Sequence, residues 1–241
     1  MNGTMVQNQS SQLKLGIQGG LTIAIGYMPI AITYGFIAKS TELSLLETVL
    51  MSAFVYAGAS QYMALDMIAR SVGMIEIVIT TFIVNIRHFL MSASLNEKTE
   101  KVARWKKALY AFGITDETFS VAAVQKDKLS ASYMFGLNIT AYSSWVFFSA
   151  VGFLIGEILP EFFQEGMSVA LYAMFIGLLV PSMKGNRKVV ILATIAAVFH
   201  SFFSFLHLLS TGWAIVVSTL LSACLVELVY YKKEEEGKES E

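Results

Sequence analysis

The sequence is poor in charged residues and in cysteine, and each shortage excludes a class of protein. Only 15% of its 241 residues are charged, and the formal net charge of −1 offers no basic surface to nucleic acid. The single cysteine, Cys224, rules out an internal disulfide framework, and no Cys/His cluster has metal-ligand spacing. We therefore expect no nucleic-acid partner and no metal, and we interpret Cys224 as a packing residue within an apolar run.

Motifs for nucleotide hydrolysis and for nucleophilic catalysis are also missing. The chain has no Gly-x-x-x-x-Gly-Lys-Ser/Thr phosphate loop and no Gly-x-Ser-x-Gly nucleophile elbow. An intramembrane enzyme is a weaker alternative, with His200 and Ser201 or Ser204, or the pair Asp116 and Glu117, as its catalytic groups. We expect a protein that is not an enzyme and needs no cofactor.

Long apolar runs are what the sequence has in abundance. Hydrophobic residues make up 55% of the chain, and the mean hydropathy is +0.61. The uncharged run 15–38 is long enough to span about 30 Å of hydrocarbon as a helix. Further candidate spans are residues 48–65, 77–95, 108–124, 129–156, 167–183, 189–206 and 211–231. The chain is therefore expected to be an all-α, polytopic protein of the lipid bilayer.

The distribution of lysine and arginine predicts the orientation of these spans, because cytoplasmic loops keep positive charge during insertion. Basic residues concentrate at positions 98–107, 126–128, 184–188 and 232–233. Residues 108–124 have basic flanks on both sides and carry two carboxylates, which favours a segment that enters and returns on one side. The prediction is a bundle with about seven crossings plus this broken or re-entrant segment, with the N-terminus outside and the C-terminus inside.

The same pattern divides the chain into three parts. Residues 1–14 form a polar N-terminal segment, residues 15–231 a single transmembrane transport domain, and residues 232–241 a charged cytoplasmic tail. Within the bundle, Gly16 with Gly20, and Gly152 with Gly156, have the small-xxx-small spacing that allows two helix backbones to approach closely.

A candidate substrate site lies in the stretch from Phe54 to Tyr62. Its small and hydroxyl residues favour local unwinding of a helix, which exposes backbone groups able to bind the charged ends of an amino acid. We predict substrate contacts there and at a nearby asparagine: Gly58, Ala59, Ser60, Gln61 and Asn85. The alternative is a close helix crossing at the glycine, with the glutamine hydrogen-bonded across helices.

Ionisable residues inside apolar segments form a second candidate group. Charges in such segments are costly, so they usually mark a pathway or a pair. Arg87 is expected either to reach the cytoplasmic side with its long side chain or to pair with Asp116 or Glu117. His88 titrates nearest neutrality and is a candidate proton carrier or a structural histidine. We predict coupling or gating roles for all four residues.

Three motifs together resemble one known family. They are Val-Tyr-Ala-Gly-Ala-Ser-Gln at 55–61, Thr-Thr-Phe-Ile-Val-Asn-Ile-Arg-His at 80–88 and Thr-Asp-Glu-Thr-Phe at 115–119. Their order and spacing resemble the AzlC family of branched-chain amino acid permeases, over residues 12–230. The resemblance implies a secondary transporter, the large subunit of an exporter of branched-chain amino acids and often methionine in the bacterial inner membrane. It also implies a small AzlD-type membrane partner. A channel-like or scaffolding subunit whose partner supplies the path is the alternative.

Overall fold

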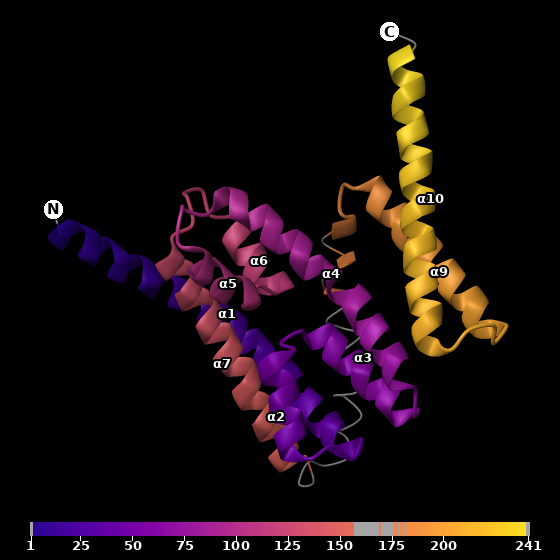
Figure 1. Cartoon of the computed structure of the whole chain (residues 1–241), viewed down its shortest axis with the longest axis horizontal. Helices are drawn as coiled ribbons and strands as arrows, with labels where there is room; N and C mark the ends of the chain where they lie inside the picture. The colour runs from indigo at the N-terminus through magenta and orange to yellow at the C-terminus, as the bar shows by residue number, and fades with distance from the viewer. Residues whose placement is uncertain (1, 157–168, 170–175, 178, 181, 240–241) are drawn as a thin grey trace. The chain divides into compact units, whose positions relative to one another are not determined.

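The computed structural model describes residues 2–156, 169, 176–177, 179–180 and 182–239 (Figure 1). They fall into two compact units, one formed by Met1–Asp66 with Val84–Ala173 and the other by Met67–Ile83 with Met174–Glu241. The helices are α1 (Asn2–Ser40), α2 (Leu45–Phe54), α3 (Gly58–Ala69), α4 (Met74–Lys98), α5 (Arg104–Phe112), α6 (Asp116–Ala123), α7 (Ala131–Ile155), α9 (Arg187–Phe205) and α10 (Thr211–Glu239). The division into one transport domain and two terminal segments stays a prediction.

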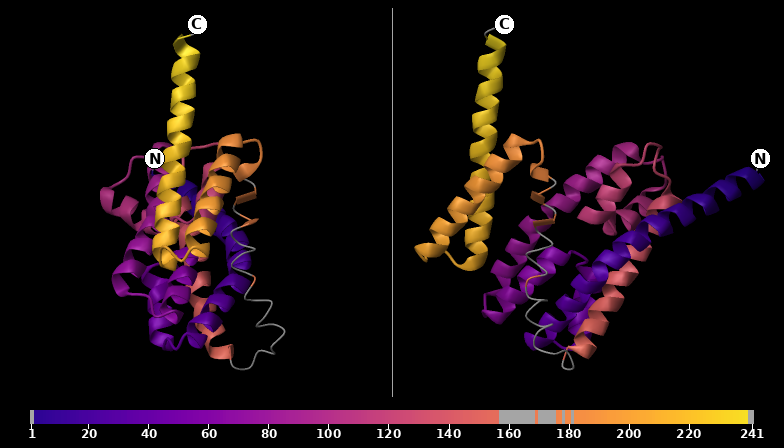
Figure 2. Two further views of the ribbon diagram at one scale, coloured as in Figure 1. Left: turned by 90° about the vertical axis from the view of Figure 1, so that its right-hand side faces the viewer. Right: turned by 180° about the vertical axis from the view of Figure 1, so that it is seen from behind.

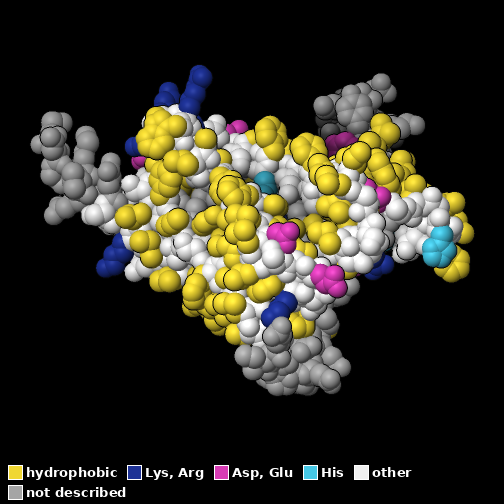
Figure 3. All heavy atoms as spheres, turned by 60° about the horizontal axis from the view of Figure 1, so that its bottom comes forward, with side chains coloured by type: hydrophobic (Ala, Val, Ile, Leu, Met, Phe, Trp, Pro, Cys, Tyr) yellow, Lys and Arg dark blue, Asp and Glu magenta, His cyan; other side chains and the backbone are white. Residues whose placement is uncertain are grey.

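The predicted polytopic helical membrane bundle is confirmed. Five of the described helical segments are long and apolar enough to cross a membrane: Ser10–Ser40, Met74–Lys98, Ala131–Ile155, Arg187–Phe205 and Gly212–Tyr230. Large apolar side chains are exposed along them, as on the face drawn in Figure 3, where hydrophobic side chains predominate. A surface of this kind suits hydrocarbon rather than water. The predicted span 167–183 lies mostly outside the described residues.

Glycines allow α1 and α7 to pack in direct backbone contact. A Cβ atom added at Gly16 would lie 2.1 Å from the carbonyl oxygen of Tyr133, and one at Gly152 would lie 2.0 Å from that of Ile32. No larger side chain fits at either position without separating the helices. The predicted close contacts at the small-xxx-small glycines are therefore confirmed, and the two helices run side by side in Figure 1 and in the right-hand view of Figure 2.

These contacts also fix the relative direction of the two helices. Early residues of α1 meet early residues of α7, and late residues meet late ones, with Ser144 Oγ donating to the Ala24 carbonyl at 3.0 Å between them. The helices are therefore parallel. The predicted orientation, with an external N-terminus, requires them to be antiparallel and is wrong. Its error arose from counting residues 48–65 as one continuous crossing.

Residues 48–65 form two helices instead of one. A capping box between Ser44 and Glu47 starts α2, in which each side chain bonds the other's backbone amide. The helix ends at Phe54, and Tyr56 then adopts a positive φ of 41°, a conformation that bulky residues rarely accept. The chain restarts as α3 at Gly58, so unwinding occurs where the small residues predicted it.

Helices α2 and α3 form a hairpin whose tip is residues 55–57. Gln61 Nε2 donates to Ser52 Oγ across the tip at 3.1 Å. Both arms also contact the same tyrosine of α1, because Tyr34 Oη donates to the Thr48 carbonyl at 3.3 Å and its ring lies 5.9 Å from that of Tyr62. Residues on either side of the tip thus lie at one level, and the chain turns back towards the end of α1 from which it came.

Residues 108–124 form a second hairpin, with α5 and α6 as its arms and residues 113–115 as its tip. Its two flanks meet, because Leu129 N donates to the Lys98 carbonyl at 2.9 Å and Glu100 N donates to the Leu129 carbonyl at 3.0 Å. Lys98 Nζ also donates to the last carbonyl of α6, at Ala123, at 2.7 Å. The predicted broken segment is confirmed, and its ends lie together as re-entry on one side requires.

The second unit contains the hairpin of α9 and α10, which Lys188 and Glu227 join by an ion pair at 2.7 Å. Glu76, at the start of α4, accepts hydrogen bonds from the backbone N–H groups of Gly212 at 3.1 Å and Trp213 at 3.3 Å. The carboxylate thereby caps the N-terminus of α10, where negative charge is favourable. Glu76 is therefore a structural contact between the start of α4 and the start of α10.

Candidate functional site

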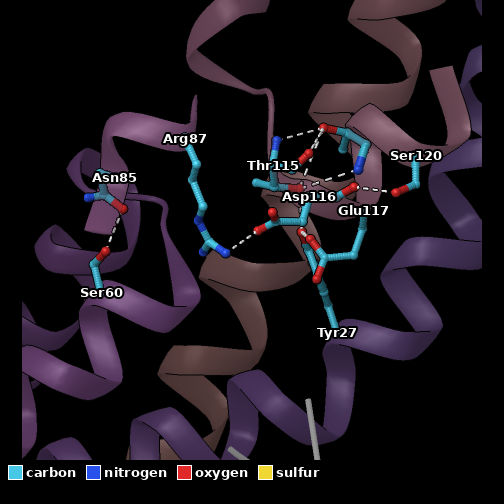
Figure 4. Close-up of polar contacts among 9 residues, drawn as sticks. Tyr27, Ser60, Asn85, Arg87, Thr115, Asp116, Glu117 and Ser120 are labelled. Atoms are coloured by element: carbon cyan, nitrogen blue, oxygen red, sulfur yellow. Dashed lines mark hydrogen bonds and ion pairs between the residues drawn. The ribbon is translucent and has the colours of Figure 1, made fainter. Parts of the chain in front are cut away.

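Arg87, near the middle of its helix, pairs with an acidic residue. It belongs to α4, and its Nη1 lies 3.0 Å from Asp116 Oδ2, the first residue of α6 (Figure 4). Both side chains keep only partial exposure, 31% and 23%. The predicted pairing of this arginine with one of the two carboxylates is present, and the alternative, a side chain extended towards the cytoplasmic surface, is not adopted.

The tip of the second hairpin positions both carboxylates. Thr115 caps α6: its Oγ1 accepts from Thr118 N at 3.4 Å, while Thr118 Oγ1 accepts from Thr115 N at 2.8 Å. Asp116 and Glu117 therefore occupy the first turn of a helix, where the helix dipole favours negative charge by about 0.3–1 kcal/mol. The sequence Thr-Asp-Glu-Thr carries this capping signal, although sequence analysis considered only the charges.

Glu117 has a different partner from Asp116. Tyr27 Oη, from α1, donates to Glu117 Oε2 at 2.6 Å and lies 2.7 Å from Thr115 Oγ1 (Figure 4). Sequence analysis missed this tyrosine, and no local pattern points to it, since it lies 90 positions away from the carboxylate that it contacts. Tyr27 links the first membrane helix to the charged hairpin tip.

Two predicted substrate residues, Ser60 and Asn85, come together from α3 and α4. Ser60 Oγ forms a short hydrogen bond to Asn85 Oδ1, two residues before Arg87 (Figure 4). His88 is half-buried on the same helix, within electrostatic range of Arg87 and Glu117. Asn85, predicted to bind substrate, thus lies next to Arg87 and His88, predicted to act in coupling, along α4.

Gln61 is fully buried and bonded across helices, as the alternative interpretation of this segment proposed. Its Oε1 accepts from Trp145 Nε1 at 3.0 Å, and its Nε2 donates to Ser52 Oγ. Ser52 Oγ continues the chain of bonds to Ser149 Oγ at 2.8 Å. Both ends of the amide are satisfied by protein groups, so this side chain fastens the first hairpin to α7.

Gly58 and Ala59 lie at the start of α3, against the same tryptophan-bearing helix. A Cβ at Gly58 would lie 2.9 Å from Cη2 of the Trp145 indole, which indicates a close approach, and Ala59 is buried at 2% exposure. The first backbone hydrogen bond of α3 runs from Gln61 N to the Ala57 carbonyl at 2.9 Å, so the N–H groups of Gly58, Ala59 and Ser60 have no acceptor within that helix.

Aromatic rings bring the two hairpin tips together. The ring of Tyr56, in the first tip, lies 5.0 Å from that of Tyr142 in α7 and 6.3 Å from that of Phe112, which ends α5. The ring of Tyr27 lies 5.2 Å from that of Trp145 in an edge-on arrangement. Two interrupted helical segments, which enter from opposite ends of the α1–α7 pair, therefore meet at one place. Sequence analysis missed this aromatic lining.

Comparison with known proteins places the chain in a family. The family model described as AzlC protein matches residues 22–159, more than half of the chain, and spans the helices and tips that build this site. The chain belongs to the AzlC family, a family of transport-related membrane proteins. No solved structure shows significant similarity.

Three relatives illustrate the range of the family. The inner membrane protein YgaZ of Escherichia coli is 30% identical over 188 residues, which cover 75% of this chain and 77% of the relative. An uncharacterized membrane protein of Archaeoglobus fulgidus is 29% identical over 209 residues, covering 85% and 90%. The branched-chain amino acid transport protein AzlC of Bacillus subtilis is 25% identical over 171 residues, covering 70% and 66%.

Proposed function

We propose that this member of the AzlC family is the large subunit of a secondary transporter that exports branched-chain amino acids and methionine. The observation that carries the proposal is the Arg87–Asp116 ion pair at the meeting point of two interrupted helical hairpins inside an apolar bundle. Interrupted membrane helices are typical of carriers, whose substrates bind exposed backbone groups at the break. The Bacillus relative, named as a branched-chain amino acid transport protein, supports the choice of substrate.

The substrate carboxylate would bind at the start of α3. There the backbone N–H groups of Gly58, Ala59 and Ser60 and the positive end of the helix dipole favour an anion. Asn85 is bonded to Ser60 and lies on the same helix as Arg87. A substrate bound at the first turn of α3 would therefore shift Asn85 and, through α4, Arg87. Gln61 would contribute by holding α3 against α7 at the correct angle.

Coupling would reside in the charged tip of the second hairpin. In the state described, Arg87 and Asp116 are joined, which closes a link between α4 and α6. Protonation of Asp116 would remove its charge and release the arginine, and His88 and Glu117 are the further titratable groups at this tip that would take part in proton transfer. The transporter would then use the proton gradient, consistent with a sequence that lacks a nucleotide-binding loop.

The complete exporter would include a small AzlD-type membrane protein and would act in the bacterial inner membrane. The name of the Escherichia coli relative supports that location. The competing proposal assigns the path to the partner and makes this chain a channel-like or scaffolding subunit. The two differ in whether flux through the assembly saturates and responds to the proton gradient.

Reconstitution of this chain in liposomes, with and without a small AzlD-type membrane protein, tests the proposal. Flux of leucine, isoleucine, valine and methionine is measured with and without an imposed pH gradient. We expect saturable leucine flux that the gradient drives against a leucine gradient, and its loss in Asp116→Asn. Flux that rises linearly with leucine concentration, or that is unaffected by Asp116→Asn in the complete assembly, would assign the path elsewhere.

A further inference from the structure

Tyr56, at the tip of the first hairpin, has an unsatisfied hydroxyl and an unusual backbone conformation, and its aromatic packing requires neither. Its side chain is 2% exposed, and in the described part of the chain its hydroxyl has no hydrogen-bond partner of good geometry, although the Tyr27 hydroxyl lies close by. Its backbone adopts a positive φ of 41°. A buried hydroxyl without a partner destabilises the folded state, and so does a tyrosine in the left-handed backbone conformation. Such unfavourable features are common at binding sites, where a ligand can supply the missing interaction. Phenylalanine would pack in the same place without the first cost.

Glu117 is a second group that lacks an interaction partner, in this case a positively charged one within the described residues. Arg87 pairs with Asp116, and in the described part of the chain no cation pairs with Glu117. Its Oε2 accepts one hydrogen bond, from Tyr27. Tyr56 lies within electrostatic range of both Glu117 and Tyr27. The Glu117 carboxylate and the Tyr56 hydroxyl thus interact with the same Tyr27 hydroxyl inside an apolar bundle, and in the described part of the chain neither has a positively charged donor.

We propose that Glu117, Tyr56 and Tyr27 bind the ammonium group of the substrate amino acid. A primary ammonium has three N–H donors, and the carboxylate and the two phenol oxygens are three acceptors. The ring of Tyr27 and its neighbour Trp145 add aromatic surface of the kind that attracts organic cations. This assignment rests on the proposed function, because it places the second charged end of the same substrate.

Both ends of the substrate would then contact the first hairpin, the ammonium group at Tyr56 and the carboxylate at the start of α3. Tyr56 closes the tip, and the first turn of α3, which would bind the carboxylate, starts two residues later at Gly58. In an α-amino acid the ammonium and carboxylate groups are separated by a single carbon atom, so neighbouring positions are required. The assignment gives Tyr56 a role in affinity that would not extend to a ligand without an amino group.

Binding of two ligands to the purified assembly of this chain with its partner tests the assignment. One is leucine, and the other is 4-methylpentanoate, which is leucine without its amino group. We expect Tyr56→Phe to weaken leucine binding by about tenfold or more, the loss of a hydrogen bond to a charged group, and to leave 4-methylpentanoate binding unchanged. Its thermal midpoint should equal or exceed that of the unmodified protein, because a buried unpaired hydroxyl has been removed.

Tyr110→Phe is the matched control. Within the described residues the Tyr110 hydroxyl is also buried and without a partner, but its ring packs against Phe135 and it is not among the residues proposed to bind the ammonium group. Both ligands should bind this variant normally. Tyr27→Phe is a second probe of the same site and should weaken leucine binding selectively even if Tyr56→Phe fails to accumulate.

The outcomes separate this assignment from the proposed function. If the unmodified protein binds leucine and Tyr56→Phe binds it equally well, or loses both ligands equally, the ammonium site is wrong and the proposed substrate stands. If the unmodified protein does not bind leucine, the proposed substrate itself is wrong, and the ammonium site falls with it. Leucine binding that requires sodium ions, with sodium affinity lowered in Tyr56→Phe, would assign the oxygens to a metal cation instead.

Discussion

The two interrupted hairpins share a shape but differ in how their tips are held. Neutral hydrogen bonds of buried side chains, from Gln61 to Trp145 and Ser52, fasten the α2–α3 hairpin to α7. The α5–α6 tip instead presents a partly exposed ion pair, Arg87 with Asp116. A neutral, fully satisfied network has a single favourable arrangement, whereas an ion pair can be opened by a proton or a competing charge. We therefore expect the first hairpin to stay fixed and the second to be able to move.

The sharpest test of this comparison is the side from which each hairpin enters, since labelling of a position is all or none. Single cysteines at Gln7, Glu42, Lys101 and Lys126 are introduced into a chain without Cys224 and treated with an impermeant reagent. Positions 7, 101 and 126 should react from the cytoplasmic side and position 42 only from the other, because α1 and α7 are parallel and the flanks of the second hairpin meet. Labelling of 101 and 126 from different sides would contradict the re-entrant hairpin.

The next largest effect should come from breaking the ion pair. Arg87→Gln leaves Asp116 uncompensated and should cost about 3 kcal/mol of stability, near the lower end for buried pairs because both side chains keep some exposure. Arg87→Gln combined with Asp116→Asn should recover at least about 1 kcal/mol relative to the sum of the single variants. The combination with Glu117→Gln should be additive. Unfolding in a membrane mimic and leucine flux are the two measurements.

Coupling of equal size in both double variants would show that the arginine alternates between the two carboxylates. Additivity in both would show that it pairs with neither under the conditions of measurement. The second tip would then carry no specific link to α4, and the two hairpins would not differ in how they are held.

Removal of the neutral network should affect stability without altering the proton response. Gln61→Met keeps the bulk of the side chain but leaves the Trp145 N–H and the Ser52 hydroxyl with one partner fewer, at about 1–3 kcal/mol. We expect lower thermal stability and reduced leucine flux whose dependence on pH keeps its shape. A shifted pH profile in this variant, measured beside Asp116→Asn, would mean that the first hairpin also takes part in coupling.

The smallest expected effect is the difference in stability lost when a helix cap is removed from each hairpin. Thr115→Ala removes a buried cap at the charged tip, together with its contact to Tyr27, and should cost about 1–2 kcal/mol. Ser44→Ala removes the exposed cap at the entrance to α2 and should cost about 0.5 kcal/mol. Thermal unfolding of the two variants side by side measures the difference. Equal losses would indicate that the tip of the second hairpin is no more tightly specified than a surface turn.

Several features followed from sequence because they depend on local composition or on strong physical penalties. Apolar runs of membrane length identified the long helices, and glycine spacing identified the contact between α1 and α7. The high cost of charges in an apolar segment limited the expected partners of Arg87 to Asp116 or Glu117, with extension to the cytoplasmic side as the alternative, and the structure shows Asp116. The small residues around Gly58 predicted the interruption after α2.

The direction of the N-terminus and the lining of the site depended on tertiary structure. The rule for basic loops could not orient α1, whose neighbouring loops carry few charges, and hydropathy does not distinguish a hairpin of two short helices from one crossing. Tyr27, Tyr56 and Trp145 looked like ordinary aromatic packing residues, because their sequence neighbours reveal nothing of the carboxylates or amides they meet. The sequence by itself determined which segments enter the membrane and which charges must find partners. Only the packing of parallel helices around two hairpin tips decided which distant side chains those partners face.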